Sequence, residues 1–259
     1  DDRVFIEKFV EGPHHIEIQV IGDQKGQVIT FGERECSAQR KYQKIIEESP
    51  SPFIDEKARR KMMKATQEAA EKIHYRSLGT FEFLVDQKKR FYFMEANTRV
   101  QVEHPITEMV YGINLIKTQL RAAAGEKVGF PIDLKMRGHA IECRINAEDP
   151  ETFIPSPGKI DFLVFPGGEG IRVDSAAYAG WEISPYYDSL IAKIIVYAPS
   201  RDLAISKMKA ALETTTIVGI KTNIPLLLNI LSSTDFINCN YTTQFVEKFL
   251  SQKPPVETQ

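Results

Sequence analysis

Two short strand-like segments, joined by a polar turn, bring two glutamates within reach of each other. Thr80–Val85 and Arg90–Ala96 have the composition of strands, and the turn Asp86–Lys89 separates them. If the loop holds an even number of residues, Glu82 and Glu95 lie on the same face, directly opposite or diagonal. Two carboxylates at that range repel unless a cation lies between them or one binds a proton. Such hard oxygen ligands favour Mg²⁺ or Mn²⁺, with phosphate oxygens and waters as the remaining ligands.

The segment after the second strand continues at a period of two. If Glu95–His104 is extended, one face carries carboxylate, amide, guanidinium, amide and carboxylate groups. These residues are Glu95, Asn97, Arg99, Gln101 and Glu103. The row offers a metal ligand, a guanidinium that suits a planar oxyanion, and a candidate general base. From spacing alone the alternative is a solvent-facing strand with mixed charges, although Ala96, Thr98 and Val100 are not bulky enough for an ordinary core face.

The rest of the chain mixes strands and helices without regular alternation, which predicts an α+β fold. Strands are expected at Val4–Val10, His15–Ile21, Gln27–Phe31, His139–Asn146 and Leu190–Tyr197. Helices are expected at Asp55–Ile73, Ile113–Ala124, Arg201–Leu212 and Pro225–Leu231. The predicted inward stripes are Ala58, Met62, Ala65, Ala69 and Ile73, and Ala204, Ile205, Met208, Ala211 and Leu212. Arg34–Glu48 is polar and shows no clear period.

Composition places the chain among ordinary globular proteins. It has 259 residues, 42% of them hydrophobic, and 33 basic against 35 acidic side chains give a formal charge of −2. The length predicts one or two domains. The near-neutral charge argues against nucleic acid as a partner, and no apolar stretch approaches about 18 residues, which argues against a membrane span. The three cysteines are far apart, as is typical of reduced thiols, so we expect a cytoplasmic location.

Several long motifs follow one another in a recognisable order. Glu95–His104 has the pattern E-x-N-x-R-x-Q-V-E-H, and further motifs are Glu33–Ser37, Gly79–Phe83, Gly138–Ala140, Glu142–Pro150 and Pro185–Ser189. Together they closely resemble the signatures of biotin carboxylases, which are ATP-grasp ligases. The resemblance covers essentially the whole chain. It implies the second half of an ATP-grasp core with an antiparallel sheet at residues 1–129, followed by a biotin carboxylase C-terminal domain at residues 130–259.

The resemblance implies a ligase reaction in two stages. ATP phosphorylates bicarbonate to carboxyphosphate, which then delivers CO₂ to N1′ of biotin on a biotin carboxyl carrier protein. The segment Glu47–Pro52 leads us to expect the biotin carboxylase subunit of acetyl-CoA carboxylase, with carboxyltransferase subunits as partners and a role in fatty acid synthesis. The alternative is the same module of a propionyl-CoA, methylcrotonyl-CoA or pyruvate carboxylase. A homodimer is also implied, with the biotin carrier on a separate chain or segment.

Family members carry an N-terminal α/β domain and a small glycine-rich lid before the region that these motifs cover. The present chain starts at Asp1, without Met, in a strand-like run. We therefore expect a fragment that lacks both units and is inactive, or nearly so, by itself. The alternative function for such a fragment is a non-catalytic module that binds nucleotide or dimerises.

The resemblance also implies roles for the polar row and its surroundings. Glu82 and Glu95 match the metal-binding carboxylates, and Asn97 matches an auxiliary ligand. Glu103 matches the base that deprotonates bicarbonate, and Arg144 matches the residue that stabilises the ureido enolate of biotin. The implied catalytic residues are Lys44, Arg99, Glu103 and Arg144. The implied bicarbonate and biotin pocket consists of Lys44, Arg99, Gln101, Val102 (through its backbone) and Arg144.

An ATP site is implied around the start of the chain. Backbone groups at Lys8 and Val10 match the hinge that pairs with adenine, and Glu7 matches the acceptor for the adenine amine. Tyr42 departs from the family pattern, in which many members carry His or another polar residue. The implied ATP-binding residues are Glu7, Lys8, Phe9, Val10, His15, Gln39, Tyr42, Glu82, Leu84 and Glu95. His15 and Gln39 match contacts to the ribose and phosphates.

Overall fold

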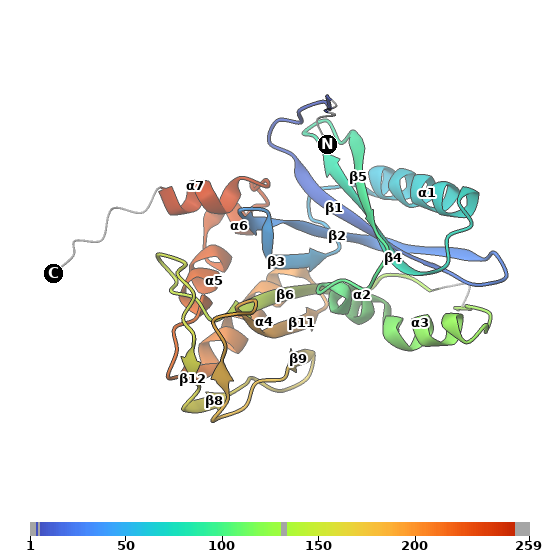
Figure 1. Ribbon diagram of the computed structural model, residues 1–259. Coiled ribbons are helices and arrows are strands. Elements are labelled where there is room, and N and C mark those ends of the chain that lie inside the picture. Colours follow the sequence, from blue (N-terminus) through green and yellow to red (C-terminus); the bar gives the residue numbers. More distant parts are fainter. Residues whose placement is uncertain (1–3, 5, 131–133, 252–259) are drawn as a thin grey trace.

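A single antiparallel sheet of eight strands organises the molecule. The computed structural model describes residue 4 and residues 6–130 and 134–251 (Figure 1). The strand order is β5-β4-β1-β2-β3-β6-β11-β9. The strands are β1 (His14–Gly22), β2 (Val28–Arg40), β3 (Gln43–Ser49), β4 (Ser77–Val85), β5 (Phe91–Asn97), β6 (His139–Asn146), β9 (Ile171–Ser175) and β11 (Leu190–Ala198). The α+β prediction is confirmed.

Two short ribbons and a set of helices complete the described part of the chain. The ribbons pair β7 (Gly158–Lys159) with β10 (Glu182–Ile183), and β8 (Phe162–Val164) with β12 (Thr216–Val218). The helices are α1 (Glu56–Lys72), α2 (His104–Tyr111), α3 (Leu115–Ala123), α4 (Arg201–Thr214), α5 (Ile224–Leu231), α6 (Thr234–Ile237) and α7 (Phe245–Ser251). No helix of the described residues is long and apolar enough to span a membrane.

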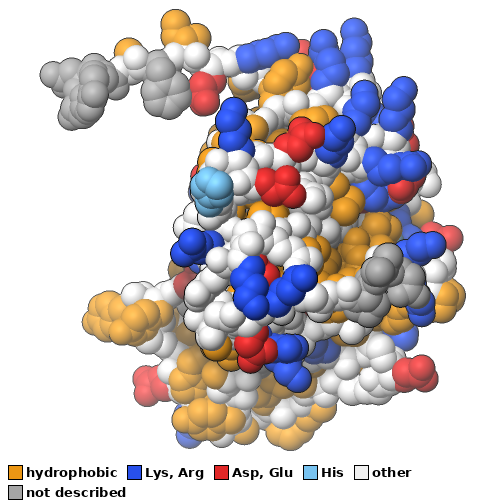
Figure 2. Space-filling view, turned by 90° about the vertical axis from the view of Figure 1, so that its right-hand side faces the viewer, with side chains coloured by type: hydrophobic (Ala, Val, Ile, Leu, Met, Phe, Trp, Pro, Cys, Tyr) orange, Lys and Arg blue, Asp and Glu red, His pale blue; other side chains and the backbone are white. Residues whose placement is uncertain are grey.

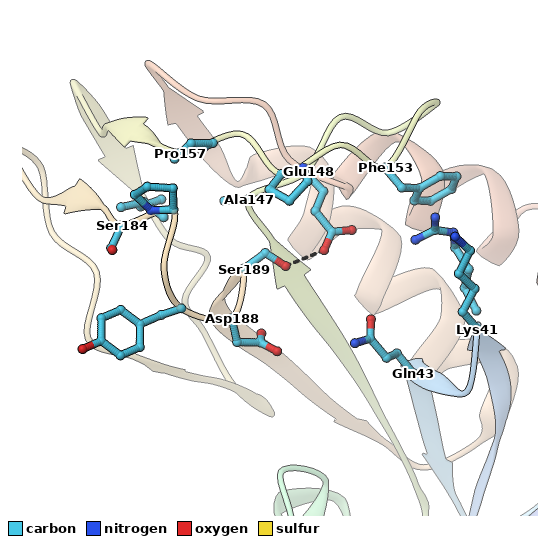
Figure 3. A pocket seen from close by; sticks show the side chains of 14 residues that line it. Lys41, Gln43, Ala147, Glu148, Phe153, Pro157, Ser184, Asp188 and Ser189 are labelled. Atoms are coloured by element: carbon cyan, nitrogen blue, oxygen red, sulfur yellow. Dashed lines mark hydrogen bonds between the residues drawn. The ribbon is translucent and has the colours of Figure 1, made fainter.

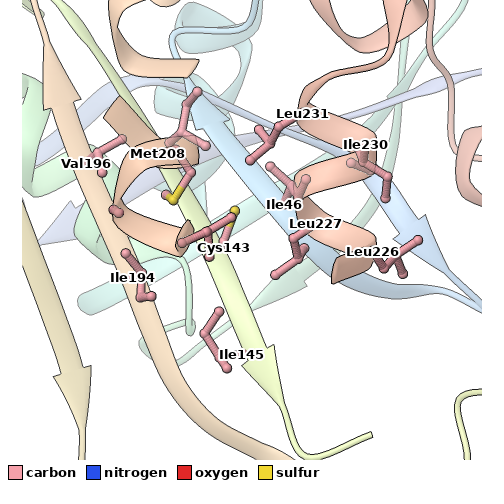
Figure 4. Packing of buried hydrophobic residues seen from close by; sticks show 14 of the residues in the cluster. Ile46, Cys143, Ile145, Ile194, Val196, Met208, Leu226, Leu227, Ile230 and Leu231 are labelled. Atoms are coloured by element: carbon pink, nitrogen blue, oxygen red, sulfur yellow. The ribbon is translucent and has the colours of Figure 1, made fainter. Parts of the chain in front are cut away.

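Helices cover both faces of the sheet. One face packs Ile16, Ile18 and Val20 of β1 against α1, and further along it packs the apolar residues of β6 and β11 against α4. Figure 4 shows this second cluster, in which Met208 of α4 lies near Cys143 of β6 and the α5 leucines. The opposite face meets α2 through its own small cluster. The sheet passes without a break from residues 1–129 to residues 130–259, because β3 pairs with β6.

Helix α1 begins where the sequence predicts, but it presents a different stripe to the sheet. The Asp55 side chain accepts a hydrogen bond from the Ala58 amide at 2.8 Å and so caps the first turn. The buried residues are Ala58, Met62, Thr66 and Ala70. The prediction is therefore wrong for Ala65, Ala69 and Ile73, since the buried positions recur every four residues. The pattern of apolar types excludes Thr66, a polar residue that the structure nevertheless buries. The predicted stripe of α4 is confirmed at every position.

Three further expectations differ from the structure. Residues 6–10 form no strand, because no neighbouring strand pairs with them. Arg34–Glu48, which shows no period, instead completes β2 and forms most of β3 around a two-residue turn with positive φ at Lys41 and Tyr42. Glu95–His104 is extended only to Asn97, and the chain then turns and enters α2, whose first turn holds Pro105.

The face that carries α1 and α3 has mixed charge. Figure 2, which views the molecule from that side, shows Lys and Arg side chains interspersed with Asp and Glu. On α1, Arg60 pairs with Glu56 at 3.2 Å and Lys64 with Glu68 at 3.6 Å, one helical turn apart. Such exposed pairs stabilise the helix only slightly.

Two neighbouring alanines of α1 test the observed stripe. Ala70→Leu should destabilise the protein by about 1–3 kcal/mol, because Ala70 is fully buried and the added atoms overpack the interface. The matched control is Ala69→Leu, which places the same side chain on the exposed side and should change stability by less than about 0.5 kcal/mol. Urea unfolding followed by circular dichroism measures both. A larger effect at Ala69 would contradict the described orientation of α1.

Candidate functional site

A cleft of about 1160 Å³ opens over the sheet, beside the ends of β3, β4, β5 and β6. Every residue that the sequence places in the site lines this cleft, except Glu7. They are Lys8, Phe9, Val10, His15, Gln39, Tyr42, Lys44, Glu82, Leu84, Glu95, Asn97, Arg99, Gln101, Val102, Glu103 and Arg144. The fold therefore gathers side chains that are up to 136 positions apart in the chain, from Lys8 to Arg144, into one site.

The β4–β5 hairpin sets the two glutamates face to face. Glu82 pairs directly with Glu95 in the register, as predicted. The length of the turn differs from the expectation of an even number of residues. Val85 pairs with Phe91, and the turn therefore holds five residues, 86–90. A register shift just after Glu82 compensates for the extra residue. Without this bulge Glu95 would point to the opposite face, since side chains alternate along a strand.

The facing carboxylates form a set of oxygen ligands that fits a divalent cation. The side-chain amide of Asn97 donates to Glu82 Oε1 and to Glu95 Oε1, at 2.9 Å each, so one point lies within hydrogen-bond range of both carboxylates. Gln101 also donates to Glu82 Oε1, at 2.6 Å. Carboxylate and amide oxygens are ligands that Mg²⁺ and Mn²⁺ prefer. These residues thus fit the metal that the resemblance implies.

The turn after β5 presents a guanidinium to the cleft. Arg99 is exposed, and its contacts are hydrogen bonds to Asn97 Oδ1 at 3.2 Å and Val100 O at 3.3 Å. Among the residues that the structure describes, Arg99 forms no ion pair with a carboxylate. Its charge is therefore available to an anion that enters the cleft.

A largely buried lysine in the lining of the cleft connects three carboxylates. Lys44 Nζ donates to Glu103 at 2.7 Å and to Glu82 at 3.3 Å, and it also contacts Glu17. Burial opposes the charge on Lys44, but the surrounding carboxylates, Glu17 foremost, raise its pKa above the usual range. Lys44 is thus a fixed cation that connects Glu82, one of the candidate metal ligands, to Glu103, the candidate base.

Glu103 lies between two cations. Its Oε1 accepts from Lys44, and its Oε2 accepts from Arg144 Nη2 at 3.1 Å. Arg144 is held from the other side by Glu47 of β3, at 2.6 Å. Burial raises the pKa of Glu47 to about 7, against the opposing effect of Arg144. The row that the sequence predicts on one extended segment is therefore divided among the end of β5, a turn and the start of α2.

Sequence reasoning missed the buried residues below this row. Arg34 is fully buried, and its guanidinium donates to Glu17, at 2.9 and 3.0 Å, and to four neutral acceptors. These acceptors are the side-chain oxygens of Gln19, Thr80, Gln101 and Thr107. The signal in the sequence is the alternation Glu17, Gln19 within an apolar strand, which is equally typical of a solvent-facing edge. Residue type alone does not separate the two cases.

The end of the cleft to which the resemblance assigns adenine is more open. Phe9 and Tyr42 are largely exposed, Val10 is buried, and Lys8 lies 5.0 Å from the centre of the Tyr92 ring. His15 is buried beside Glu82, with Nε2 at 2.9 Å from Oε2. The start of α7 borders this end, where Glu247 accepts a hydrogen bond from the Lys41 amide at 2.8 Å.

A smaller pocket of about 360 Å³ adjoins the cleft (Figure 3). It shares Arg40, Lys41, Gln43, Glu148 and Asp188 with the cleft, and its far wall comes from the loop 183–189. In Figure 3 the Ser189 hydroxyl points to Glu148, to which it donates a hydrogen bond. The pocket is therefore a side chamber of the same site.

Family models match both parts of the chain. The model described as "Carbamoyl-phosphate synthase L chain, ATP binding domain" matches residues 1–130, and the one described as "Biotin carboxylase C-terminal domain" matches residues 142–248. With the fold and the cleft, these matches define an ATP-grasp unit followed by a biotin carboxylase C-terminal domain.

Individual relatives agree with this class. The chain is 50% identical to biotin carboxylase of Haemophilus influenzae, over 96% of this chain and 56% of that protein. It is 49% identical to one of the pyruvate carboxylase subunits of Methanothermobacter thermautotrophicus, over 96% and 51%. The structure of the biotin carboxylase domain dimer of Hydrogenobacter thermophilus 2-oxoglutarate carboxylase, in complex with MgADP, ADP and bicarbonate, superimposes with a TM-score of 0.92 at 48% identity, over 96% and 56%. The chain belongs to the biotin carboxylase family and spans about half the length of the curated relatives it matches.

Arg34 gives a test of the buried support. Arg34→Met should destabilise the protein by about 3–5 kcal/mol, because it leaves the Glu17 carboxylate buried beside one fewer cation and four acceptors without their donor. The matched control is Arg60→Met on α1, whose side chain is 75% exposed and whose loss should cost less than about 0.5 kcal/mol. Thermal and urea unfolding measure the difference. Equal effects would refute the structural role of Arg34.

Proposed function

We propose that a protein containing this chain uses ATP and bicarbonate to carboxylate biotin on a carrier protein, by way of carboxyphosphate. The support comes from the family, from the cleft, and from a relative whose structure holds MgADP and bicarbonate. Because the chain spans about half the length of its relatives, the activity is proposed for the longer protein. We expect little or no turnover from the 259 residues alone.

The observation that carries this proposal is the position of Glu103 between Lys44 and Arg144. A carboxylate at this place can take the proton of bicarbonate, while Arg99, Gln101 and the Val102 backbone border the same part of the cleft. Arg144 lies on the far side of the base, where we propose that it binds the ureido oxygen of biotin. The base thus lies between the proposed sites of bicarbonate and biotin.

We propose that nucleotide occupies the other end of the cleft. The backbone at Lys8 and Val10 would bind adenine over Leu84, and His15, Gln39 and Tyr42 would line the path to the phosphates. Glu82, Glu95 and Asn97 would hold Mg²⁺ or Mn²⁺, which neutralises charge on the phosphate oxygens during phosphoryl transfer.

The acceptor of the carboxyl group and the partners are also proposed. We propose the acetyl-CoA carboxylase role in fatty acid synthesis, on the segment Glu47–Pro52. The alternative is the module of another biotin-dependent carboxylase, and the 49% identity to a component of pyruvate carboxylase favours it equally. A biotin carboxyl carrier protein, carboxyltransferase subunits, a homodimer and a cytoplasmic location complete the proposal. Co-purification of the native complex, followed by assays with acetyl-CoA and pyruvate, separates the two roles.

Glu103 and Arg99 test the chemistry. In the full-length protein, Glu103→Gln and Arg99→Ala should each lower biotin carboxylation at least about 100-fold, the first by removing the base and the second by removing the free guanidinium. Incorporation of labelled bicarbonate measures the rate, and circular dichroism checks the fold. The matched control Glu68→Gln, on the exposed face of α1, should keep the normal rate. A near-normal rate in either site variant would overturn the proposed roles.

Glu95 tests the metal site separately. Glu95→Gln should raise the Mg²⁺ concentration for half-maximal activity by at least about tenfold, because it replaces a charged ligand by a neutral one. Binding of ADP without Mg²⁺, measured by calorimetry, should stay unchanged, since adenine contacts lie elsewhere in the cleft. If the Mg²⁺ requirement did not change, Glu95 would not be a metal ligand.

A further inference from the structure

A lysine from the far part of the sheet reaches the turn that carries the candidate base. Lys193 lies on β11, and its ammonium donates a hydrogen bond to the backbone carbonyl of Val102 at 2.5 Å. The two residues are 91 positions apart in the chain. The Lys193 side chain is only 12% exposed, and it is absent from the lining of the cleft. Lys193 therefore touches the site from beneath, through a backbone group.

The bonded carbonyl belongs to the peptide between Val102 and Glu103. In a trans peptide the C=O and the following N–H point in opposite directions, and the plane is rigid. The ammonium of Lys193 holds the oxygen on the side of β6 and β11. If this peptide flipped, its carbonyl dipole would turn towards the part of the cleft that Arg99 and Gln101 border, where it would repel an anion.

The ammonium is itself held in place by acidic neighbours. Asp174 of β9 lies 3.5 Å from Lys193 Nζ, and Glu142 of β6 lies 3.9 Å from it. Burial and the facing Glu47 carboxylate hold the pKa of Glu142 well above its usual range. Asp174 also has a second partner, Arg172, at 2.7 and 2.8 Å. Asp174 therefore keeps a partner when the ammonium is removed, and Glu142, whose raised pKa favours the neutral carboxyl, has little charge left to compensate. Loss of the ammonium falls mainly on the hydrogen bond to the Val102 carbonyl.

We propose that Lys193 is a positioning residue that fixes the Val102–Glu103 peptide and keeps its carbonyl out of the bicarbonate subsite. The inference rests on the proposed function, because it assigns bicarbonate to this part of the cleft. Lys193 contacts no substrate. Its effect reaches the anion through the orientation of one peptide plane.

Steady-state kinetics of the full-length protein test the proposal. Lys193→Met keeps the aliphatic stem but removes the donor, and it should raise KM for bicarbonate about tenfold while KM for ATP stays within about twofold. At saturating bicarbonate kcat should fall by less than KM rises. Lys193→Arg, which keeps a charged donor, should recover part of the bicarbonate affinity.

Lys207 supplies a matched control. It also donates to backbone carbonyls, those of Glu169 and Tyr197 at 3.0 and 2.9 Å, but it lies on α4, away from the cleft. Lys207→Met should leave KM for bicarbonate unchanged. If Lys193→Met fails to fold, Lys193→Leu, which also lacks a donor, replaces it, with the same selective rise expected.

The outcomes separate this inference from the proposed function. An unchanged KM for bicarbonate in the folded Lys193 variant, or an equal rise in the KM values for bicarbonate and ATP, would overturn the positioning role. If Glu103→Gln is inactive in the same preparations, the proposed function survives that result. A fully active Glu103→Gln variant would instead remove the proposed function itself.

Discussion

Compensation of buried charge on one face of the sheet is the constraint on which the rest of the structure depends. Glu17, Arg34, Glu47 and Glu142 are all fully buried. A buried ion costs several kcal/mol unless a partner and further hydrogen bonds replace its lost hydration. Basic partners on neighbouring strands meet this cost: Glu17 pairs with Arg34 and Glu47 with Arg144. Glu142 lies opposite Glu47 and 3.9 Å from Lys193, and its raised pKa favours the neutral carboxyl. These ion pairs restrict the side chains around the cleft to fixed conformations.

A second buried cluster holds residues 1–129 to residues 130–259. Glu48 of β3 accepts hydrogen bonds from His139 of β6, at 2.7 Å, from Arg201 of α4, at 2.7 and 3.0 Å, and from the hydroxyl of Tyr241. Although burial opposes ionisation, these donors lower the pKa of Glu48 to about 2. Two neighbouring residues of β3 thus have different roles. Glu47 orients Arg144 at the cleft, and Glu48 binds the helices on the opposite face of the sheet.

The sequence predicted best where one face of an element is apolar and the other polar. The stripe of α4 and the bounds of β6 follow from that contrast. No strand was predicted at Arg34–Glu48, because both faces of these strands are buried and one of them lies among charged groups. Such strands show no alternation of hydrophobicity. The facing of Glu82 and Glu95 was predicted correctly, but from an even loop. The observed turn has an odd number of residues, and a bulge restores the register of the two glutamates. The residue types of the hairpin do not predict this bulge. The burial of Arg34 follows from tertiary pairing alone.

The paired charges also bear on how the proposed reaction proceeds. Before an anion enters, the carboxylates of Glu17, Glu47 and Glu103 engage Lys44 and Arg144, whereas Arg99, which follows the same strand as Glu95, forms no ion pair with a described carboxylate. In the proposed reaction, a proton on Glu103 would weaken its attraction for Lys44 and Arg144, because a neutral carboxyl no longer balances their charges. Both cations, which keep Glu17 and Glu47 as partners, would then turn a donor to the carboxyphosphate that the proposed first stage forms. In this arrangement proton transfer to Glu103 and binding of the developing anion reinforce each other.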